Sequence, residues 1–277
     1  MPYILINRIG DEIMKALVIC ICLLVLSLPS HAGLITLKSS LSCEVTPSEV
    51  IARLLLENNG NEAAYNIKVR FKIADKEWLS EVFPKLDVNQ KLEIEDLEKY
   101  EPGKKGIYPF TAKIHFQDSA GYPFTTVVAT LLVYKESADP NIFGKLEDSI
   151  LSNRGVLKFN MTNMGNDALT LGIHILIPDE LSVEPGQKEF ILKARSKEKV
   201  TFKLNNFSAL SGAVYPVWAI VEYESKDIHF TYLCSGNINV KPRANIFKKY
   251  WWFSLILIAI MMSLFIWFNL RRKIHSP

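Results

Sequence analysis

The sequence has few of the residues from which metal sites and nucleic-acid surfaces are built. It contains 4 cysteines and 5 histidines, and its formal net charge at pH 7 is only +3 over 277 residues. The basic residues are scattered along the chain, whereas a nucleic-acid-binding protein collects them on one face. The composition therefore gives no support to a nucleic-acid partner.

Motifs for catalysis and metal binding are also missing. There is no G-x-S-x-G sequence, no glycine-rich phosphate loop and no Cys–His arrangement. His115, His174 and His229 share no ligand spacing, whereas zinc needs three or four converging ligands. The acidic run 92–101 lacks the D-x-D-G pattern of a calcium loop and is predicted to be a solvated loop. We predict a protein that is not an enzyme and holds no metal or cofactor.

The N-terminal segment has the pattern of a signal peptide. Lys15 precedes the apolar run 16–28, and small residues stand before Gly33. The apolar run is too short to span a membrane. We therefore predict a signal peptide over residues 1–32, and a start of translation at Met14 would give it the usual length.

The C-terminal segment has the pattern of a transmembrane helix. Residues 251–270 are 20 residues without a charge, which as a helix would extend about 30 Å, the thickness of the hydrocarbon layer. Aromatic residues stand at both ends, and RRK follows. We predict a span over 250–270 and a short cytoplasmic tail, 271–277. With the signal peptide, this gives a single-pass protein of the cell membrane whose ectodomain lies outside the cytoplasm, in the periplasm or at the cell surface.

Between these ends, one motif occurs twice. ENNGNEAAYNIKVRF at 57–71 is echoed by TNMGNDALTLGIHIL at 162–176. In both copies, apolar and polar residues alternate before and after the Asn-x-Gly-Asn sequence, as in a strand with one buried face. Asn and Gly favour tight connections, so each copy predicts a strand–turn–strand corner with a structural role.

A second block also repeats, and it completes the architecture. Gly106-Ile107-Tyr108-Pro109 is matched by Ala213-Val214-Tyr215-Pro216, and an alternating strand follows each copy. No helical period extends over ten residues between the two ends. The sequence predicts an all-β fold of two tandem immunoglobulin-like β-sandwiches, over 33–137 and 138–242.

Several of these motifs resemble a known family. A Tyr just inside the sixth strand of each half resembles the tyrosine corner of immunoglobulin-like domains. The N-x-G-N-x-A corner, the later Pro-Gly (102–103 and 185–186) and the G-x-Y strand resemble the CARDB and NPCBM-associated domains of bacterial membrane-anchored surface proteins. Antibody-type domains have Cys where this chain has Phe110 and Val217. The resemblance implies surface modules with a structural or binding role.

Two cysteines and two asparagines are candidates for modification. Cys43 and Cys234 stand in the first and last strands of the ectodomain. In an end-to-end tandem they would lie far beyond the roughly 7 Å between Cα atoms that a disulfide allows, so free thiols or an intermolecular bond are favoured. Asn160 and Asn206 match the N-glycosylation pattern.

One difference between the halves suggests a binding surface. Positions that hold Arg, Lys and Thr in the first half hold His174, Leu176, Trp218 and Ile220 in the second. If these side chains face outward, they form an apolar patch that either binds an external protein partner or packs within the molecule, against the other domain or under loop 182–197.

These observations favour a non-enzymatic, membrane-anchored interaction or scaffold protein, for adhesion or as an accessory subunit of an envelope complex. The alternative is a carbohydrate-binding module that serves a separate glycan-active enzyme, with Trp78, Tyr122 and Trp218 as candidate glycan contacts. A surface protein with a C-terminal processing signal is a third hypothesis, although no L-P-x-T-G or Pro-Glu-Pro precedes the span.

Overall fold

A computed structural model describes residues 33–46, 49–137 and 139–241, together with six single positions between 252 and 267. The predicted signal peptide (1–32), the cytoplasmic tail (271–277) and most of the predicted span (250–270) lie outside the described residues. Within the described part, no helix combines the length and hydropathy of a membrane span. The two folded halves of the chain are described almost completely.

The first half is a sandwich of seven strands. In chain order they are β1 (Leu37–Val45), β2 (Val50–Asn58), β3 (Ala64–Ile73), β4 (Lys76–Leu86), β5 (Lys91–Glu98), β6 (Gly106–Gln117) and β7 (Pro123–Tyr134). One sheet has the order β1-β2-β5, and the facing sheet has the order β4-β3-β6-β7. All pairs within these two sheets are antiparallel.

The second half repeats this plan with nine strands. They are β8 (Ile142–Leu146), β9 (Ser149–Leu151), β10 (Arg154–Asn163), β11 (Leu169–Leu176), β12 (Leu181–Glu184), β13 (Gln187–Leu192), β14 (Lys197–Asn206), β15 (Val214–Ser225) and β16 (Ile228–Val240). The sheet β12-β14-β10-β8 faces the sheet β13-β11-β15-β16, and β9 pairs with β16. The all-β prediction is confirmed, and the two-sheet arrangement of each half is immunoglobulin-like.

Each half has its own core, built by the alternation in the sequence. Ile67, Val69, Phe71 and Ile73 on β3 are all fully buried, because alternate residues of a strand point to the same face of its sheet. The largest fully buried side chains are Phe71, Phe110, Phe159 and Phe202, two in each half. The hydrophobic effect of these two clusters holds each sandwich together.

The repeated Asn-x-Gly-Asn corner is explained by its first asparagine, which is fully buried in both copies. The Asn58 amide donates to the carbonyls of Glu62 and Leu86, and its Oδ1 accepts from the Gly60 N–H at 3.0 Å. In the second copy, the Asn163 Oδ1 accepts from the Gly165 N–H at 2.8 Å. The side chain thus satisfies backbone groups that the turn leaves without a ladder partner.

Two further sequence features can be compared with the structure. The Tyr108 hydroxyl donates to the Lys104 carbonyl at 2.7 Å, as in a tyrosine corner. The solvated loop predicted over 92–101 is wrong, because residues up to Glu98 form β5. Ile94 is only 3% exposed there, whereas Glu93 and Glu95 on the opposite face of the strand are exposed.

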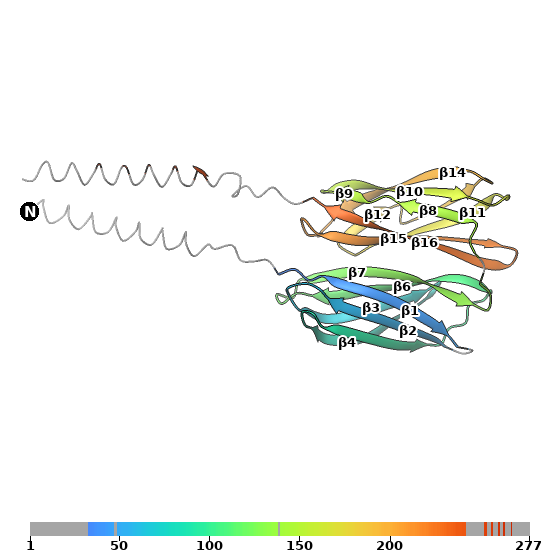
Figure 1. Cartoon of the computed structure of the whole chain (residues 1–277), viewed down its shortest axis with the longest axis horizontal. Helices are drawn as coiled ribbons and strands as arrows, with labels where there is room; N and C mark the ends of the chain where they lie inside the picture. The colour runs from blue at the N-terminus through green and yellow to red at the C-terminus, as the bar shows by residue number, and fades with distance from the viewer. Residues whose placement is uncertain are drawn as a thin grey trace, which may run out of the picture.

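The two sandwiches lie side by side along their length, with β15 and β16 next to β6 and β7 (Figure 1). His229 of β16 pairs in parallel with Gly106 of β6, so one sheet continues across both halves. The end-to-end tandem expected from the sequence is therefore wrong. The start of β1 and the end of β16 lie at the same end of the molecule (Figure 1).

Both described cysteines are free thiols. Each lies within its own half: the Cys43 Sγ is 3.7 Å from the Leu131 carbonyl oxygen, and the Cys234 Sγ accepts from the Leu146 N–H at 3.2 Å. Burial raises the pKa of Cys43 to about 11, and such a thiol is a weak nucleophile.

Candidate functional site

The apolar patch predicted from the sequence lies in the seam between the two sandwiches, where β15 and β16 pack against β6 and β7. Leu176 and Ile220 are 9% and 3% exposed, and they form a buried cluster with Val127 and Ala129 of β7. Trp218 packs against the same cluster. Of the two alternatives that the sequence left open, the structure shows packing against the other domain for these three residues, because the first sandwich covers them.

His174, the fourth residue of that patch, remains exposed at the edge of the seam. It lines a hollow of about 260 Å³ together with Lys72 and Glu222. Its neighbours include one cation and one anion, so this hollow has no strong preference for either charge.

Polar contacts flank the apolar cluster and fix the register of the two halves. The Thr231 hydroxyl is fully buried and donates to the Ile107 carbonyl at 2.8 Å. The His229 ring stacks on Tyr108 with 4.4 Å between the ring centroids. Because buried hydrogen bonds require precise partners, these contacts select one relative position of the two sandwiches.

The close approach of β6 and β16 depends on Gly106. Its φ is +140°, and a Cβ at this position would lie only 2.1 Å from the His229 carbonyl oxygen. Any other residue would therefore push the two strands apart.

Ion pairs close the seam at its surface. Lys104 Nζ lies 2.6 Å from the Glu224 carboxylate, and Lys113 Nζ lies 2.6 Å from the Asp179 carboxylate. Exposed pairs of this kind contribute about 0–1 kcal/mol each to stability. They therefore help to select the relative position of the two sandwiches more than they stabilise the contact between them.

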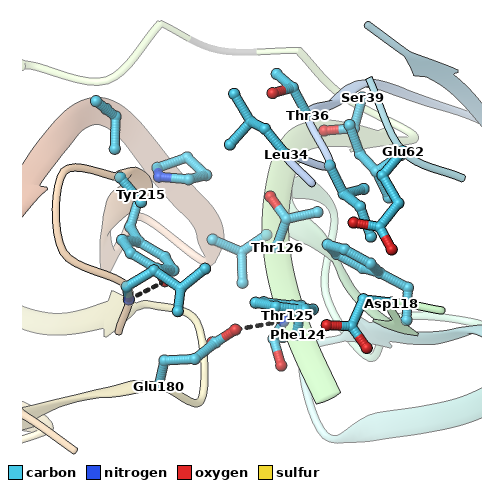
Figure 2. Close-up of a pocket in the computed structure, with 18 of the residues that line it drawn as sticks. Leu34, Thr36, Ser39, Glu62, Asp118, Phe124, Thr125, Thr126, Glu180 and Tyr215 are labelled. Carbon is cyan, nitrogen blue, oxygen red and sulfur yellow. Dashed lines mark hydrogen bonds between the residues drawn. The ribbon is translucent and has the colours of Figure 1, made fainter. Parts of the chain in front are cut away.

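One end of the seam opens into an apolar groove of about 560 Å³. It lies between residues 33–37, the strand β7 and the start of β15 (Figure 2). Its apolar lining includes Leu34, Ile35, Phe124, Val127, Val214 and Trp218. Its volume is within the range of about 300–1,000 Å³ that small-molecule sites have.

The groove exists because the outer edge of the last strand is paired in the second sandwich and unpaired in the first. In the second half, β9 pairs in parallel with residues 238–240 of β16 and covers its outer edge. In the first half, β1 pairs with β2 along its whole length, and the described ladder of β7 involves β6 alone. The outer edge of β7 thus has no ladder partner among the described strands, and the part of it around Thr125–Val128 becomes one wall of the groove.

Glu180 lies where the groove meets the seam. This residue of the second half is only 4% exposed, and its Oε1 accepts a hydrogen bond of 2.7 Å from the Thr125 N–H on the open edge of β7 (Figure 2). Its Oε2 is buried and has no hydrogen-bond partner among the described residues. Burial raises the pKa of Glu180, because desolvation disfavours the charged carboxylate.

A second hollow of about 240 Å³ adjoins the groove and is polar. His115, Asp179 and Glu180 line it, together with Asn66, Gln117 and Ser208. The His115 Nε2 is buried without a partner in the described part of the chain, and its Nδ1 lies 3.7 Å from Asp179. Burial lowers the pKa of His115 against the opposing effect of Asp179, which favours the neutral ring near pH 7.

The other residues predicted as sites lie apart from this groove or inside packed regions. Trp78 stacks on Phe110 at 6.0 Å, and Tyr122 is 42% exposed, so these two and Trp218 do not form one exposed platform. The Asn160 amide donates to Glu147 at 2.8 Å, and the Asn206 amide donates to the Ser152 carbonyl at 3.0 Å. Within the described residues, no group of three or more His, Cys, Asp or Glu side chains could hold a metal ion.

Sequence reasoning did not identify Glu180, and little in the sequence distinguishes it. It follows Pro178 and Asp179 in a polar turn, where a carboxylate is expected to be solvated. A stronger signal is the apolar run Val127–Ala129 on β7, in which all three consecutive side chains are buried, because a strand buried on both faces loses its alternation.

The fold was compared with known proteins. No protein-family model and no curated protein matches the sequence. Among solved structures, native Escherichia coli alpha-2-macroglobulin is 8% identical with a TM-score of 0.32, and the alignment covers 75% of this chain and 17% of that one. The periplasmic chaperone SfaE is 13% identical with a TM-score of 0.27, over 37% of this chain and 57% of the chaperone.

Red sea bream transglutaminase is also similar, at 9% identity and a TM-score of 0.26, over 76% of this chain and 31% of the enzyme. The chain therefore spans less than two thirds of each of these structures. At such scores and identities, the comparisons carry no argument about activity or partners.

Proposed function

We propose that this chain is a non-enzymatic, membrane-anchored interaction or scaffold protein, whose two sandwiches act outside the cytoplasm as one rigid unit. The single observation that carries the proposal is the seam that joins the sandwiches along their length. Residues 250–270 would supply the anchor and residues 1–32 the signal for export.

The seam supports a rigid unit because it combines a buried apolar cluster with specific polar contacts. Domains of one chain move relative to each other unless their interface is large and apolar. Here Val127 and Ile220 are 1% and 3% exposed, and the backbone of β16 pairs with that of β6. A partner would therefore meet a composite surface with contributions from both sandwiches in a fixed arrangement.

The position of the chain ends supports the same proposal. The start of β1 and the end of β16 lie at one end of the molecule (Figure 1). A membrane span that follows residue 241 would place this end next to the lipid surface and the opposite end away from it. The far end of both sandwiches would then be presented together to proteins of the envelope.

The test is cross-linking of the tagged full-length protein in its membrane, followed by mass spectrometry. Three forms are compared: the wild type, Ile220→Asp, which puts a carboxylate into the seam, and Ile191→Asp, a control on β13 whose side chain is 66% exposed. We expect specific protein partners with the wild type and the control, and their loss with Ile220→Asp.

Two outcomes would contradict the proposal. If no specific partner is cross-linked to the wild type, the interaction function is wrong, and a screen of glycans becomes the next experiment. If Ile220→Asp opens the seam but keeps every partner, the sandwiches do not act as one unit.

A further inference from the structure

The apolar groove and the polar hollow lie next to each other. They share four lining residues, namely Phe116, Phe124, Thr125 and Glu180. The groove is lined mainly by apolar side chains of both sandwiches. The hollow combines polar side chains with Phe116, Pro123 and Phe124. A site with one apolar and one polar compartment matches an amphiphilic molecule.

The polar compartment contains two buried atoms that need a hydrogen-bond donor. Glu180 Oε2 and His115 Nε2 are both buried without a partner in the described structure, and an unsatisfied buried polar atom costs about 1–3 kcal/mol. The His115 Nδ1 is the ring nitrogen that faces Asp179, at 3.7 Å; in the tautomer with its hydrogen on Nδ1, the Nε2 atom is an acceptor. A ligand with donors would satisfy both atoms.

The charges around the compartment also select the ligand. Asp179 and Glu180 are contributed by the second sandwich, and Lys113 and His115 by the first. Lys113 is already paired with Asp179 at 2.6 Å, and burial favours a neutral His115. An incoming carboxylate or phosphate would face acceptors, whereas an ammonium group would face two groups that accept hydrogen bonds.

We propose that the seam binds a single-chain amphiphile with a primary-amine head: the chain lies in the apolar groove, and the ammonium group bonds to Glu180 and His115. The groove continues the buried apolar cluster of the seam, so the chain of the ligand would extend an existing hydrophobic contact between the sandwiches. This binding is independent of the protein partners proposed above.

The experiment uses the full-length chain in membrane discs and three probes of equal chain length: hexylamine, hexanol and hexanoate. Binding is measured by ligand-observed NMR, with empty discs as the blank. We expect saturable binding of hexylamine, binding of hexanol that is about tenfold weaker because it lacks a charge-assisted hydrogen bond, and no binding of hexanoate.

Two variants and a control test the residues. Glu180→Gln keeps an acceptor for the Thr125 N–H but places an amide nitrogen at the free position, so the preference for the amine over the alcohol should disappear. Val214 lies at the rim of the groove and is 57% exposed, and Val214→Trp should weaken the binding of all three probes. Val156→Trp, a 43% exposed position on β10, should change nothing.

The proposal is overturned by any of three results. These are equal binding of the three probes, unchanged amine binding in Glu180→Gln, and no saturable binding of any probe above the empty discs. Val214→Trp alters only an exposed side chain, so it tests the groove even if Glu180→Gln affects folding.

Discussion

The buried asparagine of the second corner should be essential for the stability of the second sandwich. Asn163 is 0% exposed, and its amide donates to three carbonyls, those of Asp167, Leu192 and Lys193, at 2.8, 3.3 and 3.1 Å. Its Oδ1 accepts from Gly165. In Asn163→Ala, these backbone groups lose their partner inside the protein, and we expect a loss of about 3 kcal/mol in the free energy of unfolding.

The loss can be measured by calorimetry or by thermal unfolding followed by circular dichroism. For a domain of this size, 1 kcal/mol corresponds to about 4–8 °C, so the transition of the second sandwich should fall by about 12–24 °C. Asn163→Asp should lower the free energy of unfolding further near pH 7, because a carboxylate would face the three carbonyls. Part of this free energy should return in acid as that carboxylate is protonated.

The matched control for this prediction is Asn166→Ala, in the same corner. Asn166 is exposed and bonds only to Arg195 among the described residues, so its removal should cost less than about 0.5 kcal/mol. A cost for Asn163→Ala as small as that of the control would refute the reasoning, because it would mean that the turn satisfies its backbone without this side chain.

Three further predictions concern the seam and the thiol. Gly106→Ala should separate β6 from β16, since its Cβ would lie 2.1 Å from the His229 carbonyl oxygen. Amide hydrogen exchange should then become faster at the seam while both cores stay protected. Unchanged protection at the seam would contradict the prediction. The raised pKa of Glu180 means that the folded state holds its proton more tightly than the unfolded state does. The free energy of unfolding should therefore decline as the pH rises from the ordinary pKa of 4.5 through the folded-state pKa. Glu180→Gln should lack this decline, and an equal slope in both proteins would contradict the prediction. Because the pKa of Cys43 is about 11, its thiol should react with iodoacetamide at pH 8 roughly a hundredfold more slowly than an ordinary cysteine. The rate is measured by mass spectrometry of the peptide that contains Cys43. An ordinary rate would show that the thiol is not buried.

The strands of both sandwiches could be predicted because their signal is local. The alternation of Ile67, Val69, Phe71 and Ile73 gives a face that is fully buried, and side-chain alternation is a property of each strand by itself. The corners could be predicted for the same reason, since Asn58 bonds to its own turn. These elements are correct because no distant contact competes with the local preference.

The relative position of the sandwiches could not be predicted, because it depends on residues far apart in the sequence. The outward apolar residues Leu176 and Ile220 were identified, yet nothing near them in the chain shows that Val127 and Ala129 cover them. The same limit applies to the groove, whose open wall follows from β1 pairing only with β2. The charged turn at Glu180 gave no local sign that it would be buried.

The seam has a consequence for the order in which the chain folds during synthesis. Ala129 is made long before Ile220, which covers it. At about 5–20 residues per second, the interval between these two residues is about 5–18 s. During this time the first sandwich can fold, but its apolar face on β7 has no cover. For those seconds this apolar face is open to nonspecific association, and the arrival of β15 and β16 then covers it.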